Sequence, residues 1–476
     1  MEYIINGRKP EQIFRFFEEI AAIPHGSGNE KGIADYLENF AKERGIFCVH
    51  DEIHNVFMRV PATEGRENEP AVLFQAHTDM VCEKNADTVH DFLTDPLELY
   101  LDGKYLRAKG TTLGADDGIG VTTMLALLDG AVASHPEIEC LFTVSEETGM
   151  DGVNGFDFSL VKARKMINLD SEELDFAIAG CAGGVRNSLI INAKKEPASG
   201  SAVKLLLGGL AGGHSGVNIA DGHANANKLM GRVLLALSDI GYKLVSFNGG
   251  GKPNAIPREA RAVIVTDAPE KIAEAVKKLE SDISFELADC DKAFFLTAEN
   301  AELPSESFDK ATTETAVRLV SVVDNGVFEM SKKIDGFVEF SRNLGVVTTE
   351  EDKIYFTFFA RSGIDAQLEA SNRELEALAA LCGAEVEYYE NYGGWAYTPE
   401  SQVRDDYAKA YKKVTGDELT VIQIHAGLEC GIVKAQIPDM DIISVGPNAL
   451  GIHSPDEALD LDSVEVLASV IEEMLA

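Results

Sequence analysis

The sequence lacks the features that mark secreted, membrane-spanning or thiolate-bound metalloproteins. Its seven cysteines are an odd number without CxxC or Cys/His spacing, a pattern typical of reduced thiols rather than of disulfides or thiolate metal sites. No apolar run approaches the ~20 residues that span a bilayer, and the N-terminus does not have the pattern of a signal peptide. We therefore expect a cytoplasmic protein.

Basic residues are also scarce, because 42 Lys and Arg oppose 79 Asp and Glu, giving a formal net charge of −37. Such a surface repels phosphates, which disfavours nucleic acids and anionic membranes as partners. The chain has one Trp and no internal repeat, yet 45% of its 476 residues are hydrophobic, which is typical of a folded protein. This length is too great for one ordinary core, and two domains are expected.

Hydrophobic spacing predicts several helices in the first and last parts of the chain. One spans residues 11–23, and a second, which starts with the capping-box pattern Ser27-Gly-Asn-Glu30, continues to Gly45. His25 lies in the turn between them. The final helix is expected over residues 462–475, with an Asp-x-x-Glu start.

Three continuous apolar runs, each typical of a strand buried on both faces, end in acids or a histidine. They are residues 71–76 before His77-Thr-Asp79, residues 139–145 before Glu146-Glu147, and residues 165–169 before Asp170. Open α/β sheets bind their ligands outside the carboxyl ends of the strands. The sequence therefore predicts a site where these three strands end.

Asp116 lies in a glycine-rich turn just before an apolar helix that includes residues 121–128. An Asp in this position either caps the helix or offers its carboxylate to a ligand. Two metal ions about 3.5–4 Å apart need a bridging carboxylate. Because this turn can reach the space between the strand ends, Asp116 is the candidate bridge.

His77, His453 near the C-terminus and the neighbouring carboxylates form a nitrogen and oxygen donor set without thiolates. Such a set suits Zn²⁺, with Mn²⁺ or Co²⁺ as possible substitutes. Glu146 and Glu147 leave their strand in different directions, so that one can bind metal while the other holds an attacking water.

From about residue 185 the pattern changes to alternating strands and long amphipathic helices. We expect a second α/β domain over residues 185–397, inserted into a catalytic domain made of residues 1–184 and 398–476. Its Gly208–Gly216 segment fits neither common nucleotide-binding glycine pattern. Glycines there would let the backbone approach a ligand while His214 projects into it.

Eight motifs, taken in order, resemble the aminoacyl-histidine dipeptidases, which are Xaa-His (carnosinase-like) members of the co-catalytic zinc peptidase superfamily that includes carboxypeptidase G and the aminoacylases. The motifs are His77-Thr-Asp79, Gly114-Ala-Asp116-Asp-Gly-Ile-Gly, Ser145-Glu146-Glu147-Thr-Gly, Asn168-Leu-Asp170, Gly212-Gly-His214-Ser-Gly, Asn254-Ala-Ile-Pro-Arg-Glu, His425-Ala-Gly-Leu-Glu-Cys-Gly and Ile452-His453-Ser-Pro. They extend over some 380 residues, nearly the whole chain.

The resemblance implies a mixed-sheet zinc-peptidase domain with an inserted α/β domain that serves as a lid and dimerisation surface. His77 and Asp170 would hold one zinc, Glu147 and His453 the other, and Asp116 both. It further implies that Asp79 orients the ligand imidazole and that Glu146 is the general base.

The same resemblance implies roles for residues of the inserted domain. His214 would stabilise the oxyanion, across a homodimer, and Asn254 and Arg361 would bind the C-terminal region of the substrate. Asp117 departs from the family pattern, which commonly has Asn there, and Tyr392-Gly-Gly-Trp395 lacks an expected Pro before Gly-Trp.

The predicted function is a dizinc dipeptidase that acts on small peptides, either of Xaa-His type or over a broader range. Two alternatives remain open: a tripeptidase or N-acyl-amino-acid amidohydrolase of the same superfamily, and a metal-binding homologue without catalysis. The sequence predicts no role for His425 or Glu429.

Overall fold

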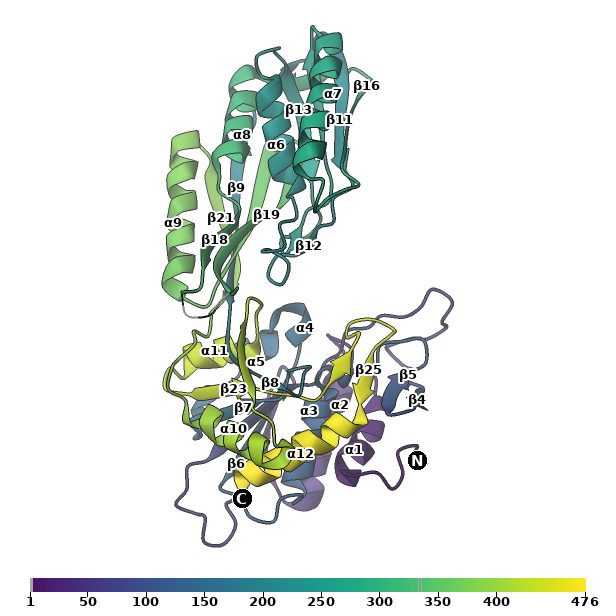
Figure 1. Cartoon of the computed structure of the whole chain (residues 1–476), viewed down its shortest axis with the longest axis vertical. Coiled ribbons are helices and arrows are strands. Elements are labelled where there is room, and N and C mark those ends of the chain that lie inside the picture. Colours follow the sequence, from purple (N-terminus) through teal and green to yellow (C-terminus); the bar gives the residue numbers. More distant parts are fainter. Residues whose placement is uncertain (1–2, 333, 335) are drawn as a thin grey trace. The chain divides into compact units, whose positions relative to one another are not determined.

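A computed structural model describes residues 3–332, 334 and 336–476, which form two compact units (Figure 1). The first unit comprises Met1–Gly180, Trp395–Gln423 and Leu428–Ala476, and the second comprises Cys181–Gly394 and Ile424–Gly427. The chain therefore enters the second unit twice. The predicted division of the chain does not include the short second segment.

The first unit is built on an eight-stranded mixed sheet with the order β1-β2-β6-β3-β7-β23-β8-β22. Strands β6, β3, β7 and β23 are parallel neighbours, whereas β1 and β2 run antiparallel. The bounds are β1 Phe47–His50, β2 Val56–Val60, β3 Val72–His77, β6 Ile138–Thr143, β7 Lys165–Asn168, β8 Phe176–Cys181, β22 Thr420–Ile424 and β23 Asp441–Ser444.

Helices cover both faces of this sheet, which is why β3 and β6 are buried along their whole length. One face carries Phe74 and Phe142, which pack with the apolar sides of five helices: α1 Glu11–Ala21, α2 Lys31–Arg44, α3 Ala115–Leu128, α10 Gln402–Thr415 and α12 Leu461–Leu475. Gln75 and Thr143 point to the other face, towards α11 Glu429–Gln436. The predicted strands that precede the site residues are confirmed.

Short elements complete the first unit. A four-stranded sheet has the order β24-β25-β5-β4, and three short helices follow β6. Their bounds are β4 Leu99–Asp102, β5 Tyr105–Ala108, β24 Ala449–Leu450, β25 Ala458–Asp460, α4 Glu146–Gly149, α5 Asp151–Gly155 and the 3₁₀ helix Phe158–Leu160.

Two predicted helix caps are wrong in detail. The N-cap of α2 is Glu30, which makes no side-chain capping bond, and the Ser27 hydroxyl donates to Asp79 instead of to the helix. Helix α12 begins one residue before the predicted start, because Asp460 accepts the N–H of Asp462 at 3.0 Å. Local spacing shows that a cap is available, whereas tertiary contacts decide which side chain serves.

The second unit contains a long antiparallel sheet with the order β16-β11-β15-β13-β19-β20-β9-β21, and β18 pairs with β19. The bounds are β9 Gly183–Asn192, β11 Ser201–Gly208, β13 Lys243–Gly249, β15 Ala260–Thr266, β16 Phe295–Ala301, β18 Gly326–Met330, β19 Val338–Glu350, β20 Lys353–Ser362 and β21 Glu385–Tyr392. Two short pairs accompany it: β10 Lys195–Pro197 with β17 Glu306–Phe308, and β12 Gly213–His214 with β14 Ala255–Ile256.

Four helices pack against this sheet and share one apolar core with it. They are α6 Ala226–Leu237, α7 Pro269–Glu286, α8 Lys310–Val322 and α9 Asp365–Cys382 (Figure 1). The predicted fold class, an α/β protein with a second α/β unit inserted into a mixed-sheet unit, is confirmed. No disulfide joins the cysteines of the described residues, and no helix there has the length and apolarity needed to cross a membrane.

Leu73 and Leu93 provide a matched test of the buried sheet, because Leu73 is fully buried in β3 whereas Leu93 is 69% exposed. Leu73→Ala should lower the free energy of unfolding by about 2–5 kcal/mol, since it leaves a cavity in a packed core. Leu93→Ala should change it by less than about 0.5 kcal/mol. Urea unfolding followed by the fluorescence of Trp395, the single Trp and part of the first unit, measures both; equal losses would contradict this account of the core.

Candidate metal centre

The carboxylate of Asp116 faces two imidazoles, one with each oxygen. Its Oδ1 lies 3.0 Å from His77 Nε2, and its Oδ2 lies 3.0 Å from His453 Nε2. Asp170 Oδ1 lies 3.7 Å from His77 Nε2, and Glu147 Oε1 lies 2.8 Å from His453 Nε2. The five predicted ligands therefore form two groups of three that share Asp116.

The charges of this cluster fit divalent cations. Among the described ion pairs, the carboxylates of Asp116, Glu147 and Asp170 meet only histidines and no Lys or Arg. Buried carboxylates that lack a cationic partner are costly unless they bind a metal. Imidazole nitrogens with carboxylate oxygens are donors that suit zinc. The donor set therefore fits the metals that the sequence predicts.

A buried acid holds the turn that presents Asp116. The Glu457 side chain is 2% exposed and accepts the backbone N–H groups of Leu113, Gly114 and Ala115 at 2.7, 3.2 and 2.8 Å. Gly114 has a φ of 68°, a left-handed conformation that glycine adopts without strain. Asp116 itself is non-helical, with φ −86° and ψ 108°, inside the first turn of α3. It is therefore aimed at the histidines rather than at the helix.

Asp79 connects the ends of β3 and β6. His77 Nδ1 lies 3.0 Å from the Asp79 carbonyl oxygen and 3.5 Å from its carboxylate, which leaves Nε2 for a ligand. The same carboxylate accepts the backbone N–H of Glu146 at 3.0 Å and of Glu147 at 3.3 Å. Ser27 Oγ donates to it at 2.7 Å. Asp79 therefore orients both the imidazole and the turn that carries the two glutamates.

Glu146 is a half-buried carboxyl group within reach of His77 and Glu147. Burial raises the pKa of Glu146 well above its ordinary value; the charge of His77 opposes the shift and Asp170 adds to it. A general base is most effective when its pKa lies near the working pH. The position of Glu146 therefore suits proton transfer.

Beneath the strand ends lies a buried polar network that sequence patterns do not reveal. Thr143 Oγ1 donates to Glu429 Oε2 at 2.7 Å, and Gln75 Nε2 donates to the same oxygen. Asn168 Nδ2 donates to Gln75 Oε1 at 2.7 Å. Burial raises the pKa of Glu429 to about 8. This network ties β3, β6 and β7 to α11 directly under the predicted ligands.

His214, predicted to stabilise the oxyanion, lies together with Asn254 and Arg361, predicted to bind substrate, in the second unit. His214 pairs with Ala255 in the short β12–β14 ladder, and the Ser215 N–H donates to the Asn254 carbonyl oxygen at 2.8 Å. Arg361 Nη2 lies 3.2 Å from His214 Nε2, and its Nη1 donates to the Tyr392 hydroxyl at 3.0 Å. Burial, followed by the charge of Arg361, lowers the pKa of His214 to about 4, so its imidazole is neutral near pH 7.

Arg361 is only 3% exposed, and among the described side chains no carboxylate forms an ion pair with it. Its guanidinium stacks on Phe359, with 4.4 Å between Cζ and the ring centroid. A buried guanidinium without an anion is a suitable site for a carboxylate, which it can bind through two hydrogen bonds.

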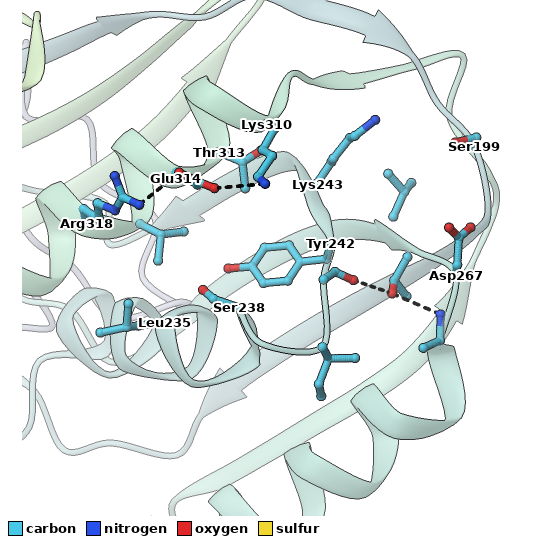
Figure 2. A pocket seen from close by; sticks show the side chains of 16 residues that line it. Ser199, Leu235, Ser238, Tyr242, Lys243, Asp267, Lys310, Thr313, Glu314 and Arg318 are labelled. Carbon is cyan, nitrogen blue, oxygen red and sulfur yellow. Dashed lines mark hydrogen bonds and ion pairs between the residues drawn. The ribbon is translucent and has the colours of Figure 1, made fainter.

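A cavity of about 530 Å³ lies elsewhere in the second unit, lined by the end of α6, by α8 and by residues at the start of β13 and the end of β15 (Figure 2). None of the predicted site residues lines it. Glu314 lies 2.9 Å from Arg318 and 3.7 Å from Lys310, and Lys243 pairs with Glu196. Tyr242 donates to the Leu234 carbonyl oxygen. The cavity therefore shows no group prepared for the chemistry of the metal centre.

Histidine and carboxylate groups gathered at the carboxyl ends of parallel strands define this protein as a metal-dependent hydrolase. Residues 73–476 match the family described as peptidase family M20/M25/M40. The chain belongs to this family, and the predicted enzyme class, a metallopeptidase that hydrolyses peptide bonds, is confirmed.

Comparison with individual proteins supports this family assignment. The chain is 38% identical to the cytosol non-specific dipeptidase of Escherichia coli strain K12 over 471 residues, 98% of this chain and 97% of that protein. It resembles the crystal structure of aminoacylhistidine dipeptidase from Vibrio alginolyticus with a TM-score of 0.88 and 37% identity, covering 98% and 97% of the two chains. A Staphylococcus aureus tripeptidase, at 15% identity, TM-score 0.56 and coverage of 98% and 97%, shares the fold alone.

Glu457 and its neighbour Asp456 allow a test of the turn that presents Asp116. Glu457→Gln should lower the free energy of unfolding by about 1–3 kcal/mol, because it weakens three charge-assisted hydrogen bonds in a buried place. It should also weaken zinc binding. Asp456→Asn, at an exposed neighbour, should change neither. Urea unfolding and zinc titration measure both effects, and unchanged zinc affinity in Glu457→Gln would show that this carboxylate does not position Asp116.

Proposed function

We propose that this protein is a dipeptidase that uses two zinc ions, with Mn²⁺ or Co²⁺ as possible substitutes, and Glu146 as general base. Its substrates are dipeptides of Xaa-His type or a broader set. The observation that carries the proposal is the Asp116 carboxylate, which offers one oxygen to the His77 group and the other to the His453 group. One carboxylate placed in this way suits two neighbouring ions.

His77 and Asp170 would hold one zinc, Glu147 and His453 the other, and Asp116 both. When bound, the ions lower the pKa of a coordinated water towards neutrality and polarise the scissile carbonyl. Glu146 takes a proton from the attacking water and later delivers it to the leaving amine. Its raised pKa makes Glu146 a stronger base than an ordinary carboxylate. Asp79 keeps His77 in the tautomer that presents Nε2.

Substrate binding would rely on the second unit. Arg361 would hold the carboxylate at the C-terminal end of the dipeptide, with Asn254 close to the same region. His214 would stabilise the developing oxyanion. A substrate with one peptide bond places its carboxylate a fixed, short distance from the scissile carbonyl, which is why a carboxylate site favours dipeptides.

The names of the two similar proteins support this choice of substrate, since both are dipeptidases. The tripeptidase alternative has only a shared fold in its favour. A homologue without catalysis would have no need for Glu146 beside a full ligand set. We further propose a cytoplasmic location, in keeping with the name of the Escherichia coli relative, and a homodimer formed through the second unit.

Glu146→Gln should retain both metal ions but lose about 10²- to 10⁴-fold in kcat, because it removes proton transfer and leaves the ligands in place. Glu64→Gln, at an exposed residue of the same unit, is the control. Metal content by atomic emission and steady-state kinetics measure the two effects. Undiminished turnover with full metal content would remove Glu146 as the base.

A substrate panel tests the function itself. β-Ala-His and Gly-Gly should be hydrolysed faster than a tripeptide or an N-acetyl amino acid, because the N-acetyl amino acid lacks the free amino group of a dipeptide and the tripeptide carries an additional residue. Treatment with a zinc chelator should abolish activity, and added zinc should restore it; a non-chelating isomer of the chelator is the control. Preference for the tripeptide or for the acetylated substrate would favour the corresponding alternative, and full activity after chelation would exclude metal catalysis.

A further inference from the structure

His425 is carried by the short segment Ile424–Gly427, which belongs to the second unit although the chain on both sides of it belongs to the first. The Ala182 N–H holds the segment through the carbonyl oxygens of Ile424, at 3.2 Å, and Ala426, at 3.0 Å. The segment is therefore fixed within the unit that contains His214 and Arg361.

Two glycines show how closely this segment is fitted against the neighbours of Arg361. A Cβ on Gly216 would come within 2.2 Å of the His425 carbonyl oxygen and 3.1 Å of the His214 ring. A Cβ on Gly427 would come within 2.9 Å of the Tyr392 hydroxyl oxygen, which accepts from Arg361. The segment thus lies between His214 and Tyr392, the two residues that flank the guanidinium.

The His425 ring is 7% exposed and makes one hydrogen bond, between Nε2 and Ser341 Oγ at 2.7 Å. Phe337 packs edge-on against it, with ring centroids 6.2 Å apart. Its Nδ1 is buried and has no hydrogen-bond partner among the described residues. A buried polar atom that lacks a partner is costly, unless a ligand supplies the partner.

We propose that His425 is a specificity-determining residue, which donates a hydrogen bond from Nδ1 to the free α-carboxylate of the substrate beside Arg361. This inference rests on the proposed dipeptidase function. It assigns His425 the task of distinguishing a free carboxylate from an amide at the C-terminal end of the substrate.

The contact between His425 Nε2 and the Ser341 hydroxyl allows Nδ1 to carry the proton and act as the donor. A hydroxyl group can donate to Nε2, and the neutral ring then carries its proton on Nδ1. Burial, followed by the charges of Arg361 and His214, lowers the pKa of His425 to about 3, so the ring is neutral near pH 7. A carboxylate offers acceptors to both the guanidinium and Nδ1–H. A C-terminal amide has one acceptor oxygen fewer than a carboxylate. Its own N–H groups would face the N–H donors of Arg361 and His425.

Two substitutions distinguish the contributions of Nδ1 and Nε2 of His425. His425→Asn places an amide N–H near the position of Nδ1, whereas His425→Gln places its amide near Nε2, where it keeps the contact with Ser341 but lacks the donor. Ser341→Ala, a milder change, removes the hydroxyl that sets the tautomer. The control is His223→Gln in the same unit, because His223 faces Asp291 at 4.0 Å rather than Arg361.

The measured quantity is the ratio of kcat/KM for a dipeptide to kcat/KM for the same dipeptide with a C-terminal amide. His425→Gln should lower this ratio by about 10-fold or more, mainly through a higher KM for the free acid, because a hydrogen bond to a charged group is lost. His425→Asn should keep most of the ratio, Ser341→Ala should lower it about 3-fold, and His223→Gln should leave it unchanged.

A purely structural role for His425 would lower kcat/KM for acid and amide together and leave their ratio constant, which would overturn the inference. The inference would also be wrong if His425→Asn lowered the ratio of kcat/KM values as much as His425→Gln does. If a His425 variant does not fold, Ser341→Ala alone decides, since an unchanged ratio there contradicts the proposed donor. Failure of the unmodified protein to cleave any dipeptide would instead overturn the proposed function.

Discussion

The Asp116 carboxylate, shared between two imidazoles, is the interaction on which the rest of the first unit depends. His77, Glu147 and Asp170 follow three strands that are parallel neighbours in the order β6-β3-β7. Parallel neighbours bring their carboxyl ends to one edge, and adjacent strands lie about 4.8 Å apart. The ends of these strands therefore lie close to one another, and the short helix α4 carries Glu147 beyond the end of β6. The turn before α3 then brings Asp116 to the same edge.

Such a concentration of like charges requires support from the surrounding protein. Several buried acids supply it: Asp79 by holding two backbone N–H groups and an imidazole, Glu457 by holding three N–H groups of the turn, and Glu429 by tying strands to a helix. None of these three acids brings a positive charge to the ligands, so the ligand carboxylates remain available to a divalent cation.

The second unit contributes chemistry of the opposite sign. Arg361 brings a buried positive charge, and the neutral imidazoles of His214 and His425 lie beside it. The first unit thus gathers side chains that suit cations, and the second gathers donors that suit an anionic group.

Much of this organisation follows from the sequence by itself. The apolar runs before His77, Glu146 and Asp170 predict buried strands because a strand covered on both faces needs apolar side chains on both. The change near residue 185 to alternating strand patterns and long amphipathic helices predicts the inserted unit. In contrast, no sequence pattern predicts what Glu457, Glu429 and His425 contact, because their hydrogen-bond partners are between about 80 and 350 positions away.

Local sequence also left the helix caps ambiguous. Ser27 has the spacing of a cap yet donates to Asp79, since the chain fold brings that carboxylate within 2.7 Å. The sequence alone thus determined which side chains are available and which strands present them, because strand burial and periodicity are local properties. Only the tertiary structure decided which buried groups pair with one another and which, like His425 Nδ1, are left for a ligand, because hydrogen-bond satisfaction depends on neighbours that are distant along the chain.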